Sequence, residues 1–294
     1  MPKNVIEPTA IPGFAVYNMA ELAVPVLLSV PHAGRDYPDP IIANLRLPPA
    51  SLLRLEDRYA DLLARDATAQ GVPTIIARRA RAWIDLNRDE GDIDVEMVSE
   101  LDRQDYPVPS TKQRGGLGLI PRRLSGEGDI WKRPFAADDV KARIFDYHRA
   151  YHSAVAQTLL RMRNKFGIAF LLDLHSMPPI AANGRDPSPA FVIGDRFGAS
   201  ASSRFAHLLT DYLKGHGFAV ALNHPYSGDH MLRHHAAVDC NVHALQLEVD
   251  RSLYLDTALR EPGKGVAAIS ALLAGLVRTV ADDWQADEIL IAAE

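Results

Sequence analysis

The stretch IAFLLDLHSMPP, residues 168–179, decides the fold that the sequence predicts. Its first seven residues are apolar apart from one aspartate, which is typical of a strand in a sheet that is covered on both faces. The polar residues that follow mark the end of such a strand, where open α/β sheets bind ligands. Further strand-like runs lie at 24–30, 72–77, 82–86, 190–194, 218–222 and 244–249.

Helical patterns separate these strands. They lie near 50–70, 138–165, 198–216 and 264–283. In the second pattern, apolar residues at helical spacings form one stripe: Ile144, Tyr151, Val155, Leu159 and Met162. The alternation of strands and helices predicts a single α/β domain over residues 1–294, with a mixed and largely parallel central sheet flanked by helices.

A segment at about 100–135 departs from this alternation. It is rich in glycine and proline and has no clear periodicity. A loop of this length inside a compact domain is usually functional or mobile. We expect a lid or a substrate loop here, and a plain surface excursion is the alternative.

The composition excludes several classes of protein. The 294 residues are 47% hydrophobic and carry a formal net charge of -5, which gives no broad basic surface for nucleic acid or an anionic membrane. The N-terminal residues lack the pattern of a signal peptide, and no apolar run reaches the roughly 18 residues that span a bilayer. We therefore expect a cytoplasmic protein. The single cysteine, Cys240, excludes an internal disulfide and predicts a buried structural thiol rather than a nucleophile.

Polar side chains gather at the ends of four predicted strands. They are His32, the pair Asn87-Arg88, His175 and Glu248. A lone histidine in such a place is usually structural, but four strands that converge on these groups favour an active site. Asp173 lies two residues before His175 on the same side of the strand, where it can accept an N–H of that imidazole.

Two imidazoles and one carboxylate are the usual protein ligands of a catalytic zinc ion. His32 and His175 would supply the imidazoles. The carboxylate is expected from the helical stretch LEDRYADLL, which leaves the choice open between Glu56, Asp57 and Asp61. Asp57 and Asp61 would share a helical face, and Glu56 would point elsewhere.

Four arginines lie beside or just after predicted strands: Arg81, Arg88, Arg233 and Arg251. Guanidinium groups bind carboxylates with paired hydrogen bonds, so they favour a small acidic substrate. Surface salt bridges are the alternative. The segment SGDHMLRHHA (227–236) is expected to be a loop, and its histidines are expected to contact substrate or, as the less favoured role, to bind metal. These histidines are His230, His234 and His235.

Together these motifs resemble the N-formylglutamate amidohydrolase family. The resemblance covers about residues 24–256, and its most specific motifs are DLNRD (85–89), LDLHSMP (172–178) and LQLEVDRSLY (245–254). The other matching segments are SVPHAGRDYP (29–38), LEDRYADLL (55–63), RARAWIDLNRD (79–89, which contains DLNRD), RGGLGLIPR (114–122), DYHRAYHSAV (146–155) and YSGDHMLRHHA (226–236).

The resemblance implies a fold and a cofactor. The family looks like a branch of the zinc carboxypeptidase and aspartoacylase type of α/β hydrolase. By this resemblance one Zn²⁺ per chain is bound by His32, Asp57 and His175.

The resemblance also implies a reaction, the zinc-dependent hydrolysis of N-formyl-L-glutamate to formate and L-glutamate in histidine degradation. Glu248 is then the catalytic carboxylate, and Arg81 assists the carbonyl oxygen. The substrate carboxylates are held by Asn87, Arg88 and one of Arg233 and Arg251.

Other functions remain open. The same chemistry could act on another N-acyl amino acid or a peptide end, and Gly228-Asp229 stands where paired glycines are expected in the substrate loop. A non-catalytic carboxylate-binding protein on the same scaffold is a second alternative. A serine hydrolase is disfavoured, because neither Ser29 nor Ser176 lies in a nucleophile-elbow pattern.

Overall fold

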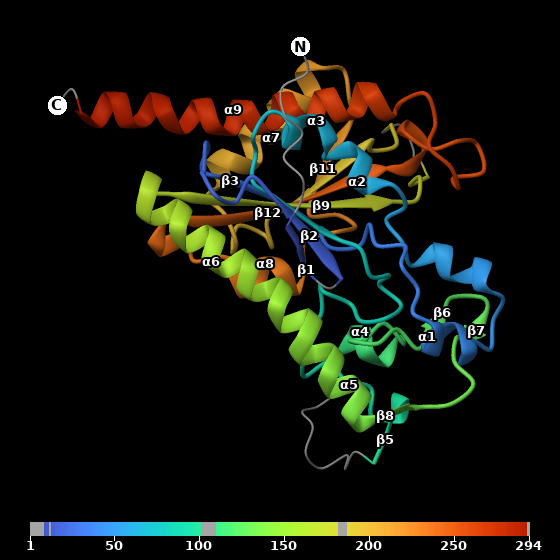
Figure 1. The fold of residues 1–294 in the computed structure, drawn as a ribbon. Helices are drawn as coiled ribbons and strands as arrows, with labels where there is room; N and C mark the ends of the chain where they lie inside the picture. The colour runs from blue at the N-terminus through green and yellow to red at the C-terminus, as the bar shows by residue number, and fades with distance from the viewer. Residues whose placement is uncertain (1–8, 12, 101–109, 182–186, 293–294) are drawn as a thin grey trace.

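A computed structural model describes residues 9–11, 13–100, 110–181 and 187–292 of the chain. These residues are arranged around an eight-stranded mixed sheet with helices on both faces (Figure 1). From one edge to the other, its strands are β1 (Thr9–Ile11), β2 (Phe14–Tyr17), β4 (Thr74–Ala77), β3 (Val26–Val30), β9 (Ala169–Met177), β12 (Val242–Asp250), β10 (Phe191–Gly194) and β11 (Val220–Leu222).

The centre of the sheet is parallel. Strands β4, β3, β9 and β12 run in the same direction, and β2 and β10 flank them as antiparallel neighbours. At the edges, β1 is antiparallel to β2, and β11 is parallel to β10. The predicted fold class is therefore confirmed: a single α/β domain with a mixed, mostly parallel central sheet.

Helices form a layer on each face of the sheet (Figure 1). One layer contains α2 (Ala60–Leu63), α3 (Arg65–Ala69), α7 (Ser203–Gly215) and α9 (Val266–Ala292). The other layer contains α6 (Arg149–Phe166) and α8 (His230–His235). Helix α5 (Ala137–Arg143) and a π-helical turn, η4 (Ile144–His148), lead directly into α6. The apolar stripe predicted along this helix is buried, as expected.

Shorter elements form a lobe beside the sheet, and part of this lobe belongs to the same hydrophobic cluster as α6. It contains α1 (Asp39–Ala43), the 3-10 helices η1 (Pro49–Arg54) and η2 (Val95–Met97), α4 (Thr111–Arg114), and the strand pairs β5 (Val98–Ser99) with β8 (Phe135–Ala136) and β6 (Arg123–Leu124) with β7 (Gly128–Asp129). Two more 3-10 turns, η5 (Val238–Cys240) and η6 (Arg251–Leu253), flank β12.

Side chains alternate between the two faces along the central strands, because successive residues of a strand point in opposite directions. Leu172 and Leu174 of β9 pack in the cluster formed by α7 and α9. Asp173 lies between these two leucines, and His175 directly follows the second. Both therefore project from the opposite face, which α6 and α8 cover. Glu248 of β12 is the register partner of His175 and projects from this face too. One face of the sheet is thus apolar, and the other carries polar groups near its carboxyl edge.

The prediction of a strand at 82–86 is wrong. The chain turns here instead: Trp83 N–H donates to the carbonyl oxygen of Ala80, and Arg88 N–H donates to that of Asp85. The place in the sheet beside β4 is taken by β2, which the sequence analysis did not predict. The polar residues Asn87 and Arg88 that follow this segment nevertheless lie at the carboxyl edge of the sheet.

The helix predicted near 50–70 is broken into η1, α2 and α3. Tyr59 has a left-handed φ of 57°, which interrupts helical geometry just before α2. Asp57 lies in this break, and its N–H donates to the carbonyl oxygen of His32 over 2.9 Å. The expectation that Asp57 and Asp61 share a helical face is therefore wrong. Because the helix is interrupted here, the backbone of Asp57 can bind the loop that follows β3.

The predicted lid or substrate loop at about 100–135 lies partly outside the described residues, because 101–109 are not among them. The described part forms α4 and short strands of the lobe. Its role as a lid stays a prediction. None of the helices in the described ranges is both long enough and apolar enough to cross a membrane.

Gly34, two residues after His32, offers a test of how the strand-end loop is packed. A Cβ atom at this position would lie 1.9 Å from the backbone oxygen of Arg79, which cannot rotate away as a side chain could. Gly34→Ala should therefore lower the free energy of unfolding by about 1–3 kcal/mol, the usual cost of overpacking. Urea titration measures this change.

The matched control is Gly215→Ala near the end of α7, where a Cβ meets nothing within 4 Å. This variant should be neutral or slightly stabilised. A Gly34→Ala protein as stable as the control would contradict the close backbone approach.

Candidate metal centre and active site

A cleft of about 1180 Å³ opens where β3, β9 and β12 end. Its walls come from the sheet, the turns after β3 and β4, and the segment before α8. Most of the site residues expected from the sequence line this cleft: His32, Asp57, Arg81, Asn87, Arg88, His175, Glu248 and Arg251. The fold thus brings together residues that lie more than 200 positions apart in the chain.

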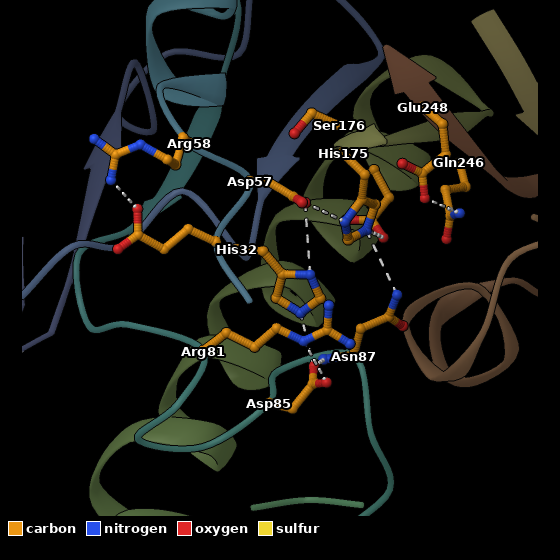
Figure 2. A network of polar contacts seen from close by, with 12 residues as sticks. His32, Asp57, Arg58, Arg81, Asp85, Asn87, His175, Ser176, Gln246 and Glu248 are labelled. Carbon is orange, nitrogen blue, oxygen red and sulfur yellow. Dashed lines mark hydrogen bonds and ion pairs between the residues drawn. The ribbon is translucent and has the colours of Figure 1, made fainter. Parts of the chain in front are cut away.

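Asp57 lies between the imidazoles of His32 and His175 (Figure 2). Its Oδ2 atom is 2.9 Å from His175 Nδ1 and 3.6 Å from His32 Nδ1. All three side chains are buried, and one possible ligand atom from each lies within 4.8 Å of the others. Two imidazoles and one carboxylate in this arrangement form a donor set that suits a catalytic zinc ion.

Each imidazole also contacts a second carboxylate through its other ring nitrogen, and Figure 2 shows this for His32 and Asp85. His32 Nε2 is 2.7 Å from Asp85 Oδ1, and His175 Nε2 is 2.8 Å from Asp173 Oδ2. Such pairs fix the orientation of the ring and direct Nδ1 toward a shared point. The predicted contact between Asp173 and His175 is confirmed. The contact of Asp85 was missed, since its segment was expected to be a strand.

The charges of this centre favour a bound cation. His32 Nδ1 is buried and has no hydrogen-bond partner within the described structure, although it faces Asp57. Burial would raise the pKa of Asp57, but the hydrogen bond and charge of His175, together with the nearby imidazole of His32, outweigh it and hold that pKa well below its usual range. Burial likewise opposes protonation of His175, yet Asp173 and Asp57 raise its pKa well above the usual value. Positive charge is therefore favoured beside Asp57, and a divalent ion on the two Nδ1 atoms would supply it.

The other two candidate carboxylates have partners elsewhere. Glu56 accepts hydrogen bonds from Arg58, at 2.7 Å, and from the hydroxyl of Tyr37. Asp61 forms a two-pronged ion pair with Arg35, at 2.7 and 2.9 Å. Of the three carboxylates left open by the sequence, Asp57 is the one that the structure places with the histidines.

Glu248 projects into the cleft beside His175 (Figure 2). The side chain is buried and accepts a 2.9 Å hydrogen bond from Gln246 Nε2. Burial raises the pKa of Glu248 to about 7, although the charge of His175 opposes this shift. A carboxyl group with such a pKa can both take and return a proton near neutral pH. Gln246 was missed, but its position two residues before Glu248 places it on the same face of β12.

The segment after β4 contributes the next group of cleft residues. Arg81 donates from Nε to Asp85 Oδ2 over 2.8 Å. Asn87 accepts the N–H of Met231 over 2.8 Å and brings its own amide nitrogen to 3.5 Å from His175 Nε2. These contacts hold the segment against both the candidate metal centre and α8.

Arg88 already has a carboxylate partner. Its Nη1 atom lies 2.8 Å from Asp229 Oδ2, and its Nε donates to the carbonyl oxygen of Leu117 over 2.8 Å. Asp229 was not expected here. It belongs to the loop in which the sequence departs from the expected paired glycines.

The two remaining arginines differ in position. Arg251 lines the cleft, but its guanidinium group binds Asp57 Oδ1 at 3.2 Å and Ser176 Oγ at 3.0 Å. This places Arg251 beside the candidate metal ligand Asp57, and its contact with substrate stays a prediction. Arg233 is half exposed, lies 3.6 Å from Asp89, and does not line the cleft.

The cleft is rich in cationic side chains: Arg54, Arg81, Arg88, Lys112, Arg251 and Arg260. This excess of donors suits an anionic ligand, because guanidinium groups bind carboxylates through charge-assisted hydrogen bonds.

Three further expectations need correction. The segment 227–236 is not a loop throughout, because α8 begins at His230. The histidines of α8 do not line the cleft, so the favoured substrate contact is not supported. Cys240 is exposed in η5 rather than buried, and it too lies outside the cleft lining. The expected buried thiol is wrong because the turn before β12 leaves the side chain at the surface.

Comparison with known proteins gives the family. A model of the family described as N-formylglutamate amidohydrolase matches residues 24–255. The chain belongs to this family. The match includes β12, the segment that follows β4, and both strand-end histidines. The residues that line the cleft therefore lie almost entirely within the match.

Relatives in this family are similar over most of the chain. N-formylglutamate deformylases from Pseudomonas aeruginosa and Pseudomonas putida are each 29% identical over 239 residues, which is 79% of this chain and 83% and 82% of theirs. The crystal structure of an N-formylglutamate amidohydrolase from Ralstonia eutropha JMP134 is similar with a TM-score of 0.86 at 28% identity, over 94% of this chain and all of that chain.

Replacement of the candidate carboxylate ligands tests the centre. Asp57→Asn keeps the shape of the side chain but removes the charge that faces both histidines. The affinity for a divalent metal should therefore fall by more than the roughly 10–100-fold that is typical when a residue behind a ligand is changed. Asp61→Asn removes a carboxylate that pairs with Arg35 and should retain the metal. Elemental analysis of both purified variants measures this, and equal metal content would show that Asp57 is not a ligand.

Proposed function

We propose that this protein is a zinc-dependent amidohydrolase that converts N-formyl-L-glutamate to formate and L-glutamate, as a step of histidine degradation. Membership of the family supports the reaction class. The observation that carries the proposal is the placement of Glu248, a buried carboxylate, in the cleft beside the Asp57–histidine centre, with cationic side chains around both.

The zinc ion is proposed to be held by His32, Asp57 and His175. When bound, zinc lowers the pKa of a water from about 15.7 toward roughly 7 and polarises a carbonyl oxygen. Asp85 and Asp173 orient the two imidazoles. This donor set leaves one position for a ligand that is not protein, as catalytic zinc sites require.

Glu248 is proposed to move the protons. It takes a proton from the attacking water and later gives one to the departing amine, since the amide cannot be cleaved unless its nitrogen is protonated. Gln246 holds one carboxylate oxygen through its 2.9 Å hydrogen bond, which orients the other toward the cleft. Arg81 is partly buried, lines the same cleft and is proposed to stabilise the oxyanion that forms on the substrate carbonyl.

Asn87 and Arg88 are proposed to hold a carboxylate of the substrate. Arg88 is buried at the wall of the cleft and presents a guanidinium group that can bind a carboxylate with two hydrogen bonds. Orientation by such a clamp lowers the reaction barrier because the substrate no longer has to find its geometry by diffusion. Arg233 and Arg251 are the proposed source of a second carboxylate contact, and Arg251 already lies in the cleft.

Replacement of Glu248 tests the claim of catalysis most directly. Glu248→Gln keeps the size of the side chain and removes the base, so kcat for formate release should fall at least roughly a hundredfold while fold and metal content stay normal. Glu127→Gln is the control, because that carboxylate also lines the cleft but lies at its exposed rim. A metal-loaded Glu248→Gln protein with near-normal kcat would leave the carboxylate-binding protein as the better explanation.

Replacement of Arg88 tests the substrate clamp. Arg88→Ala should reduce kcat/KM for N-formyl-L-glutamate by roughly a hundredfold, corresponding to about 2.7 kcal/mol, which is within the usual cost of losing a buried charge partner. Arg88→Lys should lose less but should not be normal, since a lysine cannot bind a carboxylate with two parallel bonds. Asp229→Asn should have the opposite effect and lower KM, because Asp229 competes with the substrate for Arg88. Unchanged kcat/KM in both Arg88 variants would place the substrate carboxylate elsewhere.

The second candidate function is the same hydrolysis of a different N-acyl amino acid or peptide end. The ion pair between Arg88 and Asp229 favours it, because it partly neutralises the cation proposed to bind glutamate. Measurement of kcat/KM on N-formyl and N-acetyl derivatives of glutamate, glutamine and leucine separates the two functions. A preference for a neutral side chain that Asp229→Asn reverses would favour this second candidate.

A further inference from the structure

A second cluster of histidines lies outside the cleft. It combines His148 of η4 and His152 of α6 with three histidines of α8: His230, His234 and His235. The ring centres of His148 and His152 are 4.4 Å apart, and that of His230 lies 5.1 Å from His152 and 6.0 Å from His148. The π-helical turn brings His148 into this group, and such turns are frequent at functional sites.

The first three imidazoles are oriented by oxygen atoms of one short segment. His148 Nε2 lies 2.9 Å from the carbonyl oxygen of Arg88, and His152 Nε2 lies 2.9 Å from that of Leu86. A carbonyl oxygen only accepts hydrogen bonds, so in both neutral rings the proton is on Nε2 and Nδ1 carries the lone pair. His230 Nδ1 lies 3.4 Å from Asp89 Oδ2 and also 3.4 Å from Nη2 of Arg233. Metal-binding histidines are held in the same way by carbonyl or carboxylate oxygens behind the ring.

One nitrogen of this group has no protein partner. His148 Nδ1 is buried without a hydrogen bond in the described structure and lies 3.7 Å from Glu90 Oε1. Burial lowers the pKa of His148 and lowers that of His230 to about 4, so both rings are neutral at neutral pH. A lone pair that faces a carboxylate with no proton between them is unfavourable, and a bound cation would remove this repulsion.

We propose that His148, His152 and His230 bind a second divalent transition-metal ion, separate from the centre of His32, Asp57 and His175. One ring nitrogen from each of the three lies within 4.8 Å of the others, and all three side chains are buried. Imidazole is a ligand that suits Zn²⁺, Ni²⁺ and Cu²⁺, whereas Mg²⁺ and Ca²⁺ prefer oxygen.

An alternative triad shares one member with this set. His152, His234 and His235 also lie within 4.8 Å of one another, but His234 is exposed. In addition, His235 Nε2 donates to His152 Nδ1 over 2.8 Å, which satisfies both atoms without a metal. Metal binding through Nδ1 of His148 and His152 would break this one hydrogen bond and would give the unpartnered nitrogen of His148 a metal partner. The buried triad is therefore favoured, and the alternative becomes an outcome of the test.

The second ion would stabilise the segment that carries the substrate clamp. All three oxygen partners of the imidazoles belong to residues 86–89, and the side chains of Asn87 and Arg88 face the cleft from the same segment. Ordering the imidazoles thus orders the backbone on either side of the clamp. The ion acts as a structural brace and contacts no substrate.

The experiment counts Zn²⁺ on untagged protein after dialysis against limiting free metal. Wild type should retain two equivalents. His175→Ala, which removes a ligand of the first centre, should retain one. His175→Ala combined with His148→Gln should retain none, because Gln keeps a donor for the carbonyl of Arg88 but loses the ring nitrogen. His175→Ala combined with His207→Gln is the control, since His207 is exposed on α7, and it should retain one equivalent.

Thermal unfolding supplies the second readout. Added Zn²⁺ should raise the Tm of His175→Ala, since an ion that binds only the folded state stabilises it, and should not raise that of the double variant with His148→Gln. His230→Ala in the same background gives an independent check, because it breaks no hydrogen bond to the backbone. A full equivalent of Zn²⁺ in the folded double variant with His148→Gln, or in the one with His230→Ala, overturns the proposal. Loss of one equivalent of Zn²⁺ from a protein that carries His234→Gln as its single change overturns it too. Absence of zinc from the His175→Ala protein also overturns the proposal of a second ion. That result would not count against the assignment of the first centre to His32, Asp57 and His175.

Discussion

The ionised carboxylate of Asp57 is buried, and most of the active-site architecture compensates for it. An unpaired charge in such a place would be very costly, so the protein surrounds Asp57 with His32, His175 and Arg251. The two imidazoles are in turn backed by Asp85 and Asp173. Two sets of partners therefore surround this carboxylate: imidazole and guanidinium groups contact Asp57 itself, and further carboxylates contact the imidazoles. Removing one partner leaves the next one unpaired, which explains why so many ionisable side chains are buried near the same cleft.

The sheet makes this concentration of charge possible because its two faces have different composition. Phe170, Leu172 and Leu174 of β9 pack with α7 and α9 in a predominantly apolar core. The intervening positions carry Asp173 and His175 toward the other face. Since β9 lies between β3 and β12 and is parallel to both, Ser29 and Glu248 come from equivalent strand faces. Ser29 donates to Asp173 over 3.1 Å, so even the outer carboxylate has a fixed orientation.

Much of this site could be predicted from the sequence, and the errors have physical causes. The central strands were recognisable because each is a short apolar run, and His32, His175 and Glu248 stood out because they follow or end such runs. The run at 82–86 has the same composition but forms turns, since a hairpin from the N-terminus occupies the neighbouring place in the sheet. Asp57 could not be separated from Glu56 and Asp61, because the choice depends on a left-handed residue at Tyr59. Long-range contacts such as Asp229 with Arg88 and Asp85 with His32 leave no local pattern in the sequence.

The ion pair between Arg88 and Asp229 has a consequence for selectivity among anions. A guanidinium group exposed in a cleft attracts any small anion, including chloride, phosphate and acetate, at the millimolar concentrations at which such ions occur. Here every such ion must first displace a carboxylate that is already in place and tethered to the chain. An effective concentration set by tethering is high, so weak ligands compete poorly. A ligand with several contacts elsewhere in the cleft could still displace Asp229, so under the proposed function this side chain would select against anions that lack the remainder of the substrate.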